Sequence, residues 1–440
     1  MRGIEAALKI LSENKNSFAS EALRKLADRE HMKQTDISLA SSLIYIVMRR
    51  RELWQKITGT FIHSKDKLPA QVYTAMLMGA GGLMELRRFS EGILINGIVE
   101  TLKKNKENQK YISLVNAVLR KIKENGAEII ENLKKSPVLD DRALCAGVPL
   151  WFISAWIKSW SRAEINEIFD MFALPSYSSV RTQEPEKILK LLEEKEFRAF
   201  KSNISQAIRL PESVLPVNLP GFNEGLCSVQ SESSIIAASL VKKFYTGKGL
   251  ILDMCSGRGV KAGQLLQENE NSRLECWELS ANRSKSAEHE LERLHVKDRA
   301  VLKIGDALTI TPEEPPSFIM LDAPCTGSGT WNRKPESKWQ LTWKKFDAIT
   351  DTQKKLLDRA LNLVKPGGYV LYITCSLLRQ ENESVIAEVL ASHSDCAEIS
   401  SMINFNFKSP AFKKGKPYGF YIMPCNSWLD GFYCSMIMKK

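Results

Sequence analysis

The chain has 440 residues, of which 44% are hydrophobic and 26% charged, a composition that excludes a disordered protein and supplies apolar material for two or three cores. It has no apolar run of membrane-spanning length, and its nine cysteines include no C-x-x-C pair, so we expect a cytoplasmic monomer without membrane contact, disulfide framework or metal site. The net charge of +11 favours a polyanionic partner.

The N-terminal part is predicted to be a small helical bundle, because apolar residues recur at helical spacing in residues 39–47 and 114–119. Residues 1–145 carry a net charge of +8, against +3 for the rest of the chain. Basic groups lie at or near the predicted helix ends, where cations favour the helix dipole, at 49–51, 87–88, 103–104 and 120–121. Solvated helix ends explain each group, although together they could bind phosphates.

Residues 145–240 are predicted to form an α+β connector. Trp156 and Trp160 are expected in a core, since aromatic residues at helical spacing usually pack inward, and residues 177–182 look like a strand. Loops are expected at Pro211, Pro216 and Pro220. With a helical domain over residues 1–140 and an α/β domain over 241–440, we expect three domains.

Beyond residue 245, strand-like and helix-like stretches alternate, which is typical of a doubly wound sheet. A strand over 249–253 leads through a glycine-containing loop into a helix that starts near Ala262, and such a loop lets backbone N–H groups approach a ligand. Glu278 follows the next strand, where a nucleoside cofactor would present its ribose, and Asp306 follows the third. Either residue alone could be an exposed carboxylate at a strand end. Their placement after successive strands is better explained by one crevice that both residues line.

Two cysteines follow two later strands. Cys325 comes after the apolar run 318–321, and Cys375 comes after the apolar run 369–373. Because parallel strands end at one edge of a sheet, we expect the two thiols to meet there. A free thiol is only a few per cent ionised at neutral pH, so a nucleophilic cysteine here needs activation by its surroundings.

The order and spacing of these motifs resemble the RNA cytosine-5 methyltransferases. The resemblance is carried by Asp253-Met254-Cys255 with Gly259 and Lys261, Glu278 with Arg283, Gly305-Asp306-Ala307, Asp322-Ala323-Pro324-Cys325, and Thr374-Cys375-Ser376 followed by Glu381-Asn382-Glu383. Residues 114–120 are similar to the closing helix of the NusB-like domain, and residues 430–433 to the last strand, of the bacterial ribosomal RNA small-subunit methyltransferase B family (RsmB, or Fmu). The resemblance covers essentially the whole chain.

This resemblance implies a NusB-like RNA-binding domain, a small connector and a Rossmann-like methyltransferase domain that uses S-adenosylmethionine on a cytosine of 16S rRNA. Carbon 5 of cytosine is a poor nucleophile, so a thiolate must first add to carbon 6, and we assign this attack to Cys375. In the resembling family the second cysteine, here Cys325, assists product release. The target base must leave its stack, which indicates single-stranded or flipped RNA.

Asp322 completes the expected catalytic set of Cys375, Cys325 and Asp322. It would hydrogen-bond to the cytosine or to the methionine amino group, with a turn-capping role as the competing interpretation. Lys261 would orient Asp322 or bind a methionine carboxylate. The expected cofactor-binding residues are Cys255, Ser256, Gly257, Arg258, Gly259, Val260, Lys261, Glu278, Arg283, Asp306 and Asp322.

The cofactor loop departs from the family's usual Cys-Ala-Ala-Pro-Gly-Gly-Lys-Thr, because Val260 replaces a glycine. If that position needs a positive φ, a β-branched residue there would be strained. After the Cys325 loop, three cations are candidate phosphate contacts, with solvated charge as an equal alternative: Arg333, Lys334 and Lys338. Trp331 and Trp339 could stack on the base, but we expect at least one of them in the core.

Two other classes of function remain open. One is an RNA-binding or ribosome-assembly module that kept the fold but lost cofactor affinity, and the retention of both cysteines and the acidic positions argues against it. The other is a methyltransferase acting on DNA, on protein or on another RNA. Cytosine-5 DNA enzymes attack with the Pro-Cys thiol, so a trapped adduct at Cys325 would indicate that branch.

Overall fold

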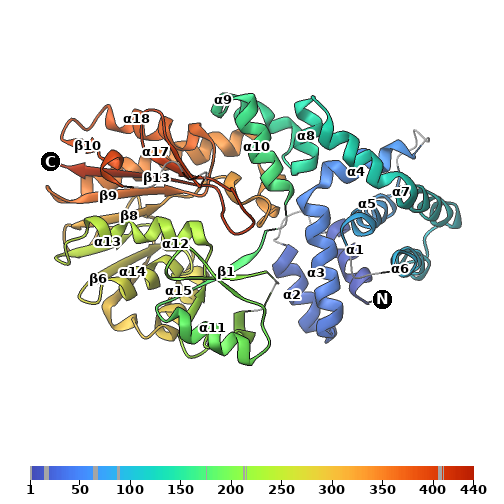
Figure 1. Cartoon of the computed structure of the whole chain (residues 1–440), viewed down its shortest axis with the longest axis horizontal. Helices are drawn as coiled ribbons and strands as arrows, with labels where there is room; N and C mark the ends of the chain where they lie inside the picture. The colour runs from blue at the N-terminus through green and yellow to red at the C-terminus, as the bar shows by residue number, and fades with distance from the viewer. Residues whose placement is uncertain are drawn as a thin grey trace. The chain divides into compact units, whose positions relative to one another are not determined.

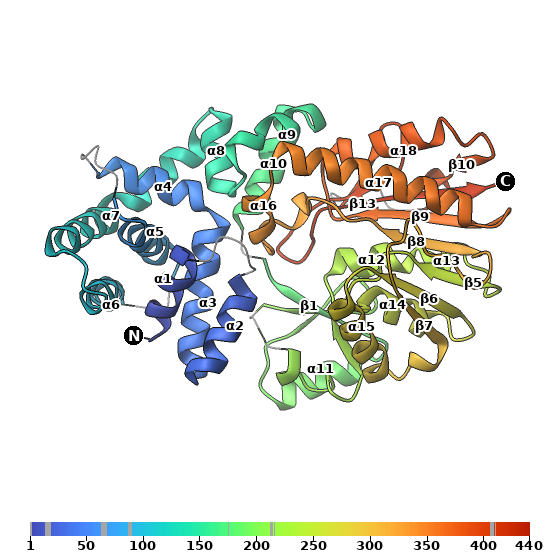
Figure 2. The same cartoon turned by 180° about the vertical axis from the view of Figure 1, so that it is seen from behind.

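The computed structural model describes residues 2–440 except 14–18, 63–67, 87–89, 175, 212–213, 215, 405–408 and 410. The chain divides into two compact units, whose elements are labelled in Figures 1 and 2. The first unit comprises Met1–Ile157, Arg162–Ala173 and Trp331–Gln340, and the second comprises Lys158–Ser161, Leu174–Thr330 and Leu341–Lys440. The expected fold class is confirmed, with N-terminal helices, a small antiparallel sheet and a C-terminal mixed α/β sheet. The three-domain division stays a prediction.

The first unit is helical, as the spacing of apolar residues predicted, and it buries one continuous core of aliphatic side chains. Its helices are α1 (Arg2–Glu13), α2 (Ala19–Glu30), α3 (Gln34–Arg49), α4 (Arg51–Thr60), α5 (Ala70–Glu85), α6 (Glu91–Lys104), α7 (Gln109–Lys135), α8 (Leu139–Ala146), α10 (Arg162–Ala173) and α16 (Glu336–Gln340), and α9 (Ile153–Ser159) begins in it.

Helix α5 lies at the centre of this bundle, because small residues let its neighbours approach closely. A Cβ atom on Gly79 would lie 2.5 Å from Leu119 of α7, and a Cβ atom on Gly82 would lie 2.6 Å from Leu94 of α6. Both distances are shorter than real carbon contacts, so only glycine permits this packing. The helix is therefore buried on most of its surface and carries few charges.

Two basic residues at the junction of α3 and α4 form internal ion pairs. Arg50 lies 3.1 Å from a carboxylate oxygen of Glu85 and donates to the carbonyl of Ala173, while Arg49 lies 3.8 Å from the same carboxylate. The side chain of Arg50 is only 13% exposed. These two guanidinium groups therefore hold helices together. Neither earlier interpretation of this basic group, a solvated helix end or a phosphate contact, accounts for that role.

The other basic pairs differ from one another. Lys103 and Lys104 lie in the last turn of α6, as expected, and form exposed ion pairs with acidic residues. The expectation that Arg120 and Lys121 lie near a helix end was wrong, because α7 spans 27 residues and ends only at Lys135. The pair at 87–88 lies outside the described residues.

The expected connector strand is the centre of a small antiparallel sheet in the second unit. The sheet has the order β2-β3-β1-β4, and α11 packs against it over a separate small core. Its elements are β1 (Ser178–Thr182), α11 (Pro185–Glu194), β2 (Phe200–Lys201), β3 (Ala207–Leu210) and β4 (Cys227–Val229).

The large sheet of the second unit has the order β11-β12-β13-β9-β8-β5-β6-β7, with β10 paired to β13. Strands β7, β6, β5, β8 and β9 are parallel, and β13 joins β9 antiparallel. The strands are β5 (Leu250–Asp253), β6 (Arg273–Glu278), β7 (Ala300–Ile304), β8 (Phe318–Asp322), β9 (Tyr369–Thr374), β10 (Cys396–Glu398), β11 (Phe412–Lys414), β12 (Phe420–Ile422) and β13 (Phe432–Lys439).

Helices cover both faces of this sheet, so its central strands are buried on both sides, as in doubly wound folds. The helices are α12 (Glu232–Ser239), α13 (Val241–Phe244), α14 (Val260–Glu268), α15 (Ala281–Arg293), α17 (Trp343–Leu363) and α18 (Glu383–Leu390). Figures 1 and 2 show α12 and α13 on one face and α17 and α18 on the other. The strand order reverses at β5 and β8, where ligands bind in such sheets.

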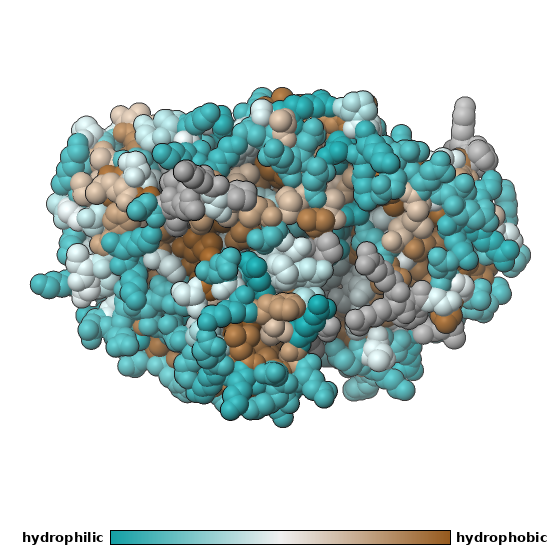
Figure 3. Space-filling model, in the orientation of Figure 1, coloured by the Kyte–Doolittle hydropathy of each residue, from teal (hydrophilic) through white to brown (hydrophobic). Residues whose placement is uncertain are grey.

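The surface drawn in Figure 3 is mostly hydrophilic, with apolar residues scattered among charged ones, which is ordinary for a globular protein. Among the residues that the structure describes, no helix has the length and hydropathy needed to cross a lipid bilayer. All nine cysteines are free thiols.

Candidate functional site

The glycine loop after β5 takes two left-handed residues before α14 begins. Gly257 has φ +57° and Gly259 has φ +76°, and Val260 is already the first residue of α14. Val260 therefore does not occupy a left-handed position, and the departure from the family pattern causes no backbone strain. Ser256, Gly257 and Gly259 turn the chain so that the first N–H groups of α14 face the carboxyl end of the sheet.

We predict that Gly259→Ala destabilises the second unit and weakens cofactor binding. An added Cβ atom would lie 2.9 Å from Cα and Cβ of Ala287, and the left-handed φ would be strained as well. We expect a loss of about 2 kcal/mol in the free energy of unfolding, measured by chemical denaturation. Gly257→Ala is the matched control: it has a left-handed φ but no atom within 4 Å of the added Cβ, so it should lose about half as much.

Asp253 ends β5 and is a fully buried carboxylate beneath this loop. Neither of its oxygens is paired with a side chain among the residues that the structure describes. Burial, followed by repulsion from Asp322, raises the pKa of Asp253 to about 7. We did not single out this residue from the sequence as a cofactor ligand, although its place at a strand end was visible there.

Lys261 and Asp322 form an ion pair beside Asp253. The Nζ atom of Lys261 donates to Oδ2 of Asp322 over 2.7 Å, which is the contact expected for this lysine. Burial opposes the charge of Lys261, but attraction by Asp322, Cys375 and Asp253 outweighs it and raises the pKa of Lys261. The ammonium group is therefore charged at neutral pH and lies within electrostatic range of Cys375.

Glu278 and Asp306 differ in burial. Glu278 is buried, its Oε1 accepts a hydrogen bond from the backbone N–H of Ser280 over 2.8 Å, and the same oxygen forms an ion pair with Arg283 over 3.1 Å. Asp306 is exposed and accepts the backbone N–H of Leu308 over 2.9 Å, so in this structure it caps its own turn. Glu278 is the last residue of β6 and Asp306 follows β7, so both lie at the same edge of the sheet, where these parallel strands end.

The remaining loop residues have individual surroundings. The backbone N–H and the hydroxyl of Ser256 both donate to the carbonyl of Trp277, which fixes the loop to β6. Burial raises the pKa of Cys255, so this thiol stays neutral, and Arg258 is exposed at the tip of the loop. Leu279, which the sequence analysis missed, directly follows Glu278 and leaves 69% of its surface exposed.

These residues fit a cationic nucleoside such as S-adenosylmethionine. The buried carboxylate of Asp253 accepts no side-chain hydrogen bond among the described residues, and an ammonium or sulfonium group would add to the attraction that Lys261 supplies. Glu278 lies at the end of the second strand, where a carboxylate accepts ribose hydroxyls. Gly259 lets the loop pack closely against Ala287 of α15, because a Cβ atom at this position would lie 2.9 Å from Ala287.

The two cysteines meet as the strand order predicted. Cys325 follows β8 and Cys375 follows β9, and these neighbouring parallel strands bring the Sγ atoms to 3.3 Å. The contact with Cys375, followed by burial, raises the pKa of Cys325 well above its ordinary value. Cys325 is therefore a neutral thiol next to a cysteine that Lys261 can help to ionise.

This distance predicts that an oxidant links the two cysteines. Diamide, which takes up two electrons and two protons, should convert the pair into an intramolecular disulfide and stop any activity until dithiothreitol is added. Mass spectrometry of an unreduced digest should find a Cys325–Cys375 cross-linked peptide that has lost two hydrogen atoms. Finding these two cysteines linked to other cysteines instead would contradict the observed geometry.

The loops that carry the two cysteines are joined by a network of buried hydroxyl groups. The hydroxyl of Ser328 lies 2.9 Å from that of Ser376, and the N–H of Gly329 donates to the carbonyl of Cys375 over 3.0 Å. Glu381, which the sequence analysis named only as part of a motif, is fully buried and bonds to both loops. The Glu-Asn-Glu motif after Cys375 was the available signal for this role.

The basic and aromatic residues after Thr330 belong to the first unit. Lys338 is fully buried and donates to the carbonyl of Arg49 over 2.7 Å, so its expected phosphate contact was wrong. Burial lowers the pKa of Lys338 well below its ordinary value. Trp331 packs on Trp156 and is 1% exposed, which confirms core packing and excludes base stacking by this side chain.

The same segment also contains Trp339, Arg333 and Lys334, which differ in exposure. Trp339 donates through its indole N–H to the carbonyl of Met48. Arg333 is partly buried, and Lys334 is exposed, so Lys334 keeps the surface position that a phosphate contact needs. The expected roles of Arg333 and Lys334 stay predictions.

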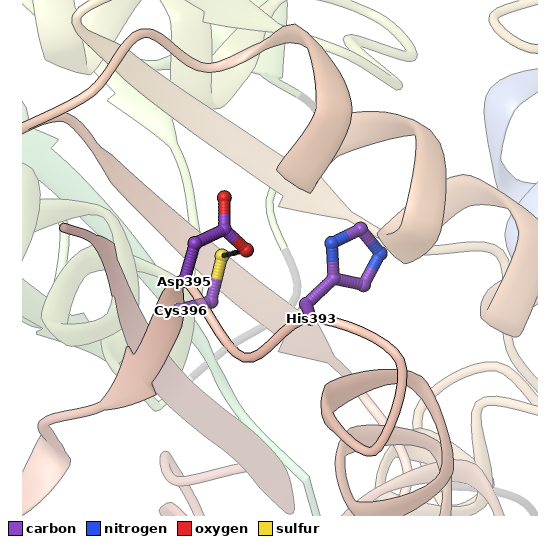
Figure 4. Close-up of side chains that lie close together, drawn as sticks. All are labelled: His393, Asp395 and Cys396. Carbon is purple, nitrogen blue, oxygen red and sulfur yellow. Dashed lines mark hydrogen bonds between the residues drawn. The ribbon is translucent and has the colours of Figure 1, made fainter.

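His393, Asp395 and Cys396 form a separate group of metal-ligating side chains, drawn in Figure 4; the first two follow α18 and Cys396 is the first residue of β10. Their ligand atoms lie within 4.8 Å of one another, and Nε2 of His393 lies 2.8 Å from Asp358. A structural zinc site needs four ligands, and this group of described residues supplies three, of which Asp395 is exposed. We therefore assign no metal to it.

Known proteins match both parts of the chain. Residues 245–438 match the family model for the 16S rRNA methyltransferase RsmB/F, and residues 3–124 match that of the NusB family. The ribosomal RNA small subunit methyltransferase B of Shewanella oneidensis is 26% identical, over 92% of this chain and 91% of its own length. That of Pseudomonas syringae pv. tomato is 30% identical, over 74% of this chain and 72% of its own. The crystal structure of PH0851 shares the fold, with a TM-score of 0.77 at 21% identity over 100% of this chain and 98% of that one.

Proposed function

Because the chain belongs to the ribosomal RNA small subunit methyltransferase B family, with a NusB N-terminal region, we propose that it methylates carbon 5 of one cytosine in 16S rRNA. As a member of this family it is an S-adenosylmethionine-dependent RNA cytosine-5 methyltransferase. We assign the attack on carbon 6 to Cys375 and assistance in product release to Cys325. The target within small-subunit RNA rests on the names of relatives that are 26% and 30% identical to this chain.

The observation that carries the proposal is the pair of thiols 3.3 Å apart at the ends of β8 and β9. Addition of a thiolate to carbon 6 makes carbon 5 nucleophilic, and later loss of the carbon 5 proton allows elimination of the enzyme sulfur. Bound S-adenosylmethionine supplies the electrophilic methyl group. A second thiol beside the first can act on the adduct without a large movement of the chain.

Lys261 and Asp322 support this chemistry from the adjacent strand ends. The ammonium group of Lys261 favours the thiolate form of Cys375 electrostatically. Asp322 leaves 30% of its side chain exposed while one oxygen binds Lys261, so its other oxygen can accept a hydrogen bond from the exocyclic amino group of a cytosine. Together the pair would hold the base over the thiol.

Two groups of residues would hold the cofactor. Asp253 and the loop from Cys255 to Lys261 would bind the methionine part of the cofactor. Glu278 would accept hydrogen bonds from its ribose hydroxyls, and exposed Leu279 would pack on its adenine. The first N–H groups of α14 complete the pocket at the helix end.

Methyl transfer to defined RNAs tests the proposal. Purified protein with methyl-labelled S-adenosylmethionine should label unmodified 16S rRNA at a single cytosine, located by nuclease digestion and mass spectrometry of 5-methylcytidine. Unmodified 23S rRNA and double-stranded DNA are the matched controls, and both should stay unlabelled. Labelling of 23S rRNA alone would contradict the 16S target, and tight RNA binding without cofactor binding would indicate an inactive RNA-binding module.

A further inference from the structure

Glu381 is a buried carboxylate that bonds to both cysteine-bearing loops at once. It ends a 3-10 turn over Arg379–Glu381 and has no exposed surface. Its Oε1 accepts the backbone N–H of Thr326 over 2.8 Å, and its Oε2 accepts the hydroxyls of Thr326 and Ser376, each over 2.5 Å. Thr326 directly follows Cys325, and Ser376 directly follows Cys375. One side chain therefore fixes the residues next to both thiols.

A third element of the fold locks this carboxylate in place. The side-chain amide of Gln353, on α17, donates to Oε1 of Glu381 over 3.1 Å and to the carbonyl of Pro324 over 2.9 Å. Burial raises the pKa of Glu381, and the hydrogen bonds from Ser376, Thr326 and Gln353 oppose this shift because they favour the ionised carboxylate. Hydrogen bonds to a charged acceptor are about twice as strong as neutral ones, which suits a rigid clamp.

The neighbouring residues of the same motif do not share this position. Asn382 bonds to the hydroxyl of Thr374 and to the carbonyl of Ser376, the two residues that flank Cys375. Glu383 is also a buried carboxylate, but it binds the hydroxyl of Tyr421 and the backbone N–H of Lys416. Among the described residues, Glu381 is the one member of this motif whose side chain hydrogen-bonds to both cysteine loops.

We propose that Glu381 is a positioning residue that sets the separation of the Cys325 and Cys375 thiols for the two steps of the reaction. This proposal rests on the proposed function for its catalytic consequence. The geometric part stands independently, because the distance between the sulfurs can be measured without RNA or cofactor. Without the carboxylate, the two loops lose a common anchor and the thiols separate, and a displacement of about 1 Å can cost about a hundredfold in rate.

Two rates measured on four proteins test the proposal: wild type, Glu381→Ala, Glu381→Gln and the control Glu383→Gln. The first is the rate of Cys325–Cys375 disulfide formation under a fixed concentration of diamide, which reports on the thiol separation. The second is the single-turnover rate of methyl transfer to 16S rRNA, measured with the dissociation constants of RNA and cofactor.

We expect Glu381→Ala to slow disulfide formation about 10-fold or more and methyl transfer about 100-fold, with cofactor affinity within about threefold of wild type. Glu381→Gln keeps the shape and one acceptor oxygen, so it should recover part of both rates. Glu383→Gln should leave both rates within about threefold, since its contacts lie away from the thiols. A purely structural role would lower cofactor affinity and thermal stability in step with activity, and glutamine would not rescue the thiol reaction.

The outcomes separate this proposal from the proposed function. If the wild-type protein forms the disulfide quickly but transfers no methyl group, the proposed function fails and the oxidation rates still test the clamp. If Glu381→Ala and Glu381→Gln both form the disulfide at the wild-type rate, Glu381 does not set the separation of the thiols and the proposal is wrong. If the alanine variant fails to fold, the glutamine variant decides alone, and wild-type rates in it overturn the proposal.

Discussion

Cys375→Ala is expected to abolish methyl transfer, while Cys325→Ala is expected to leave a covalent protein–RNA adduct that persists. Without Cys375 nothing adds to carbon 6, so carbon 5 stays unreactive and the rate should fall on the order of 10⁴-fold or more. Without Cys325 the adduct can form, because the Cys375 thiol and its neighbour Lys261 are intact. Release is then slow. Denaturing gel electrophoresis of the protein with labelled 16S rRNA detects the adduct.

The control for these variants is Cys434→Ala, because Cys434 is a buried thiol of β13 outside the cysteine loops. It should transfer methyl groups at a rate close to wild type and form no adduct. Equilibrium binding of RNA and cofactor should be unchanged in Cys375→Ala, which distinguishes lost chemistry from lost binding. An adduct that persists in Cys375→Ala and maps to Cys325 would reverse the assigned roles and match the DNA-type attack.

Strand ends were the part of the site that sequence reasoning could predict. Parallel strands share one edge, so the positions of Glu278, Cys325 and Cys375 after apolar runs were enough to expect them in one crevice. The distance between the thiols was not predictable to this accuracy, because it depends on loop contacts. The fold class followed from the same alternation of strands and helices.

Contacts between residues far apart in sequence were the part that could not be predicted. Lys338 looked like a surface cation, but it donates to a carbonyl 289 positions away and is buried. Glu381 binds a hydroxyl 55 positions away, and neither periodicity nor charge pattern signals such a bond. Arg120 was misplaced because α7 is longer than its apolar pattern suggested.

Asp253→Asn is expected to weaken cofactor binding and to stabilise the free protein at pH 8. The carboxylate is buried without a side-chain partner, and its pKa of about 7 lies above the ordinary value for aspartate. Because the folded-state pKa is raised, its contribution to stability is complete at acidic pH and is lost as pH rises through 7. The variant removes that loss, so its free energy of unfolding at pH 8 should be about 1 kcal/mol higher. The cofactor dissociation constant should rise about 10- to 100-fold.

The matched control is Glu275→Gln, since Glu275 is a buried carboxylate of β6 that is already paired with Trp277 and Lys303. Glu275→Gln should destabilise the protein and leave the cofactor affinity within about threefold of wild type. Asp253→Asn should do the opposite, raising the stability and weakening cofactor binding. Isothermal titration calorimetry measures both affinities.

The same carboxylate predicts the pH dependence of cofactor binding. A cationic ligand favours ionised Asp253, so wild-type affinity should fall about tenfold between pH 8 and pH 6, whereas Asp253→Asn should show little change. Binding at pH 7 should also release protons, which appears as a dependence of the measured enthalpy on the ionisation enthalpy of the buffer. Equal wild-type affinity at pH 6 and pH 8, with unaltered binding in Asp253→Asn, would mean that this carboxylate does not meet the cofactor.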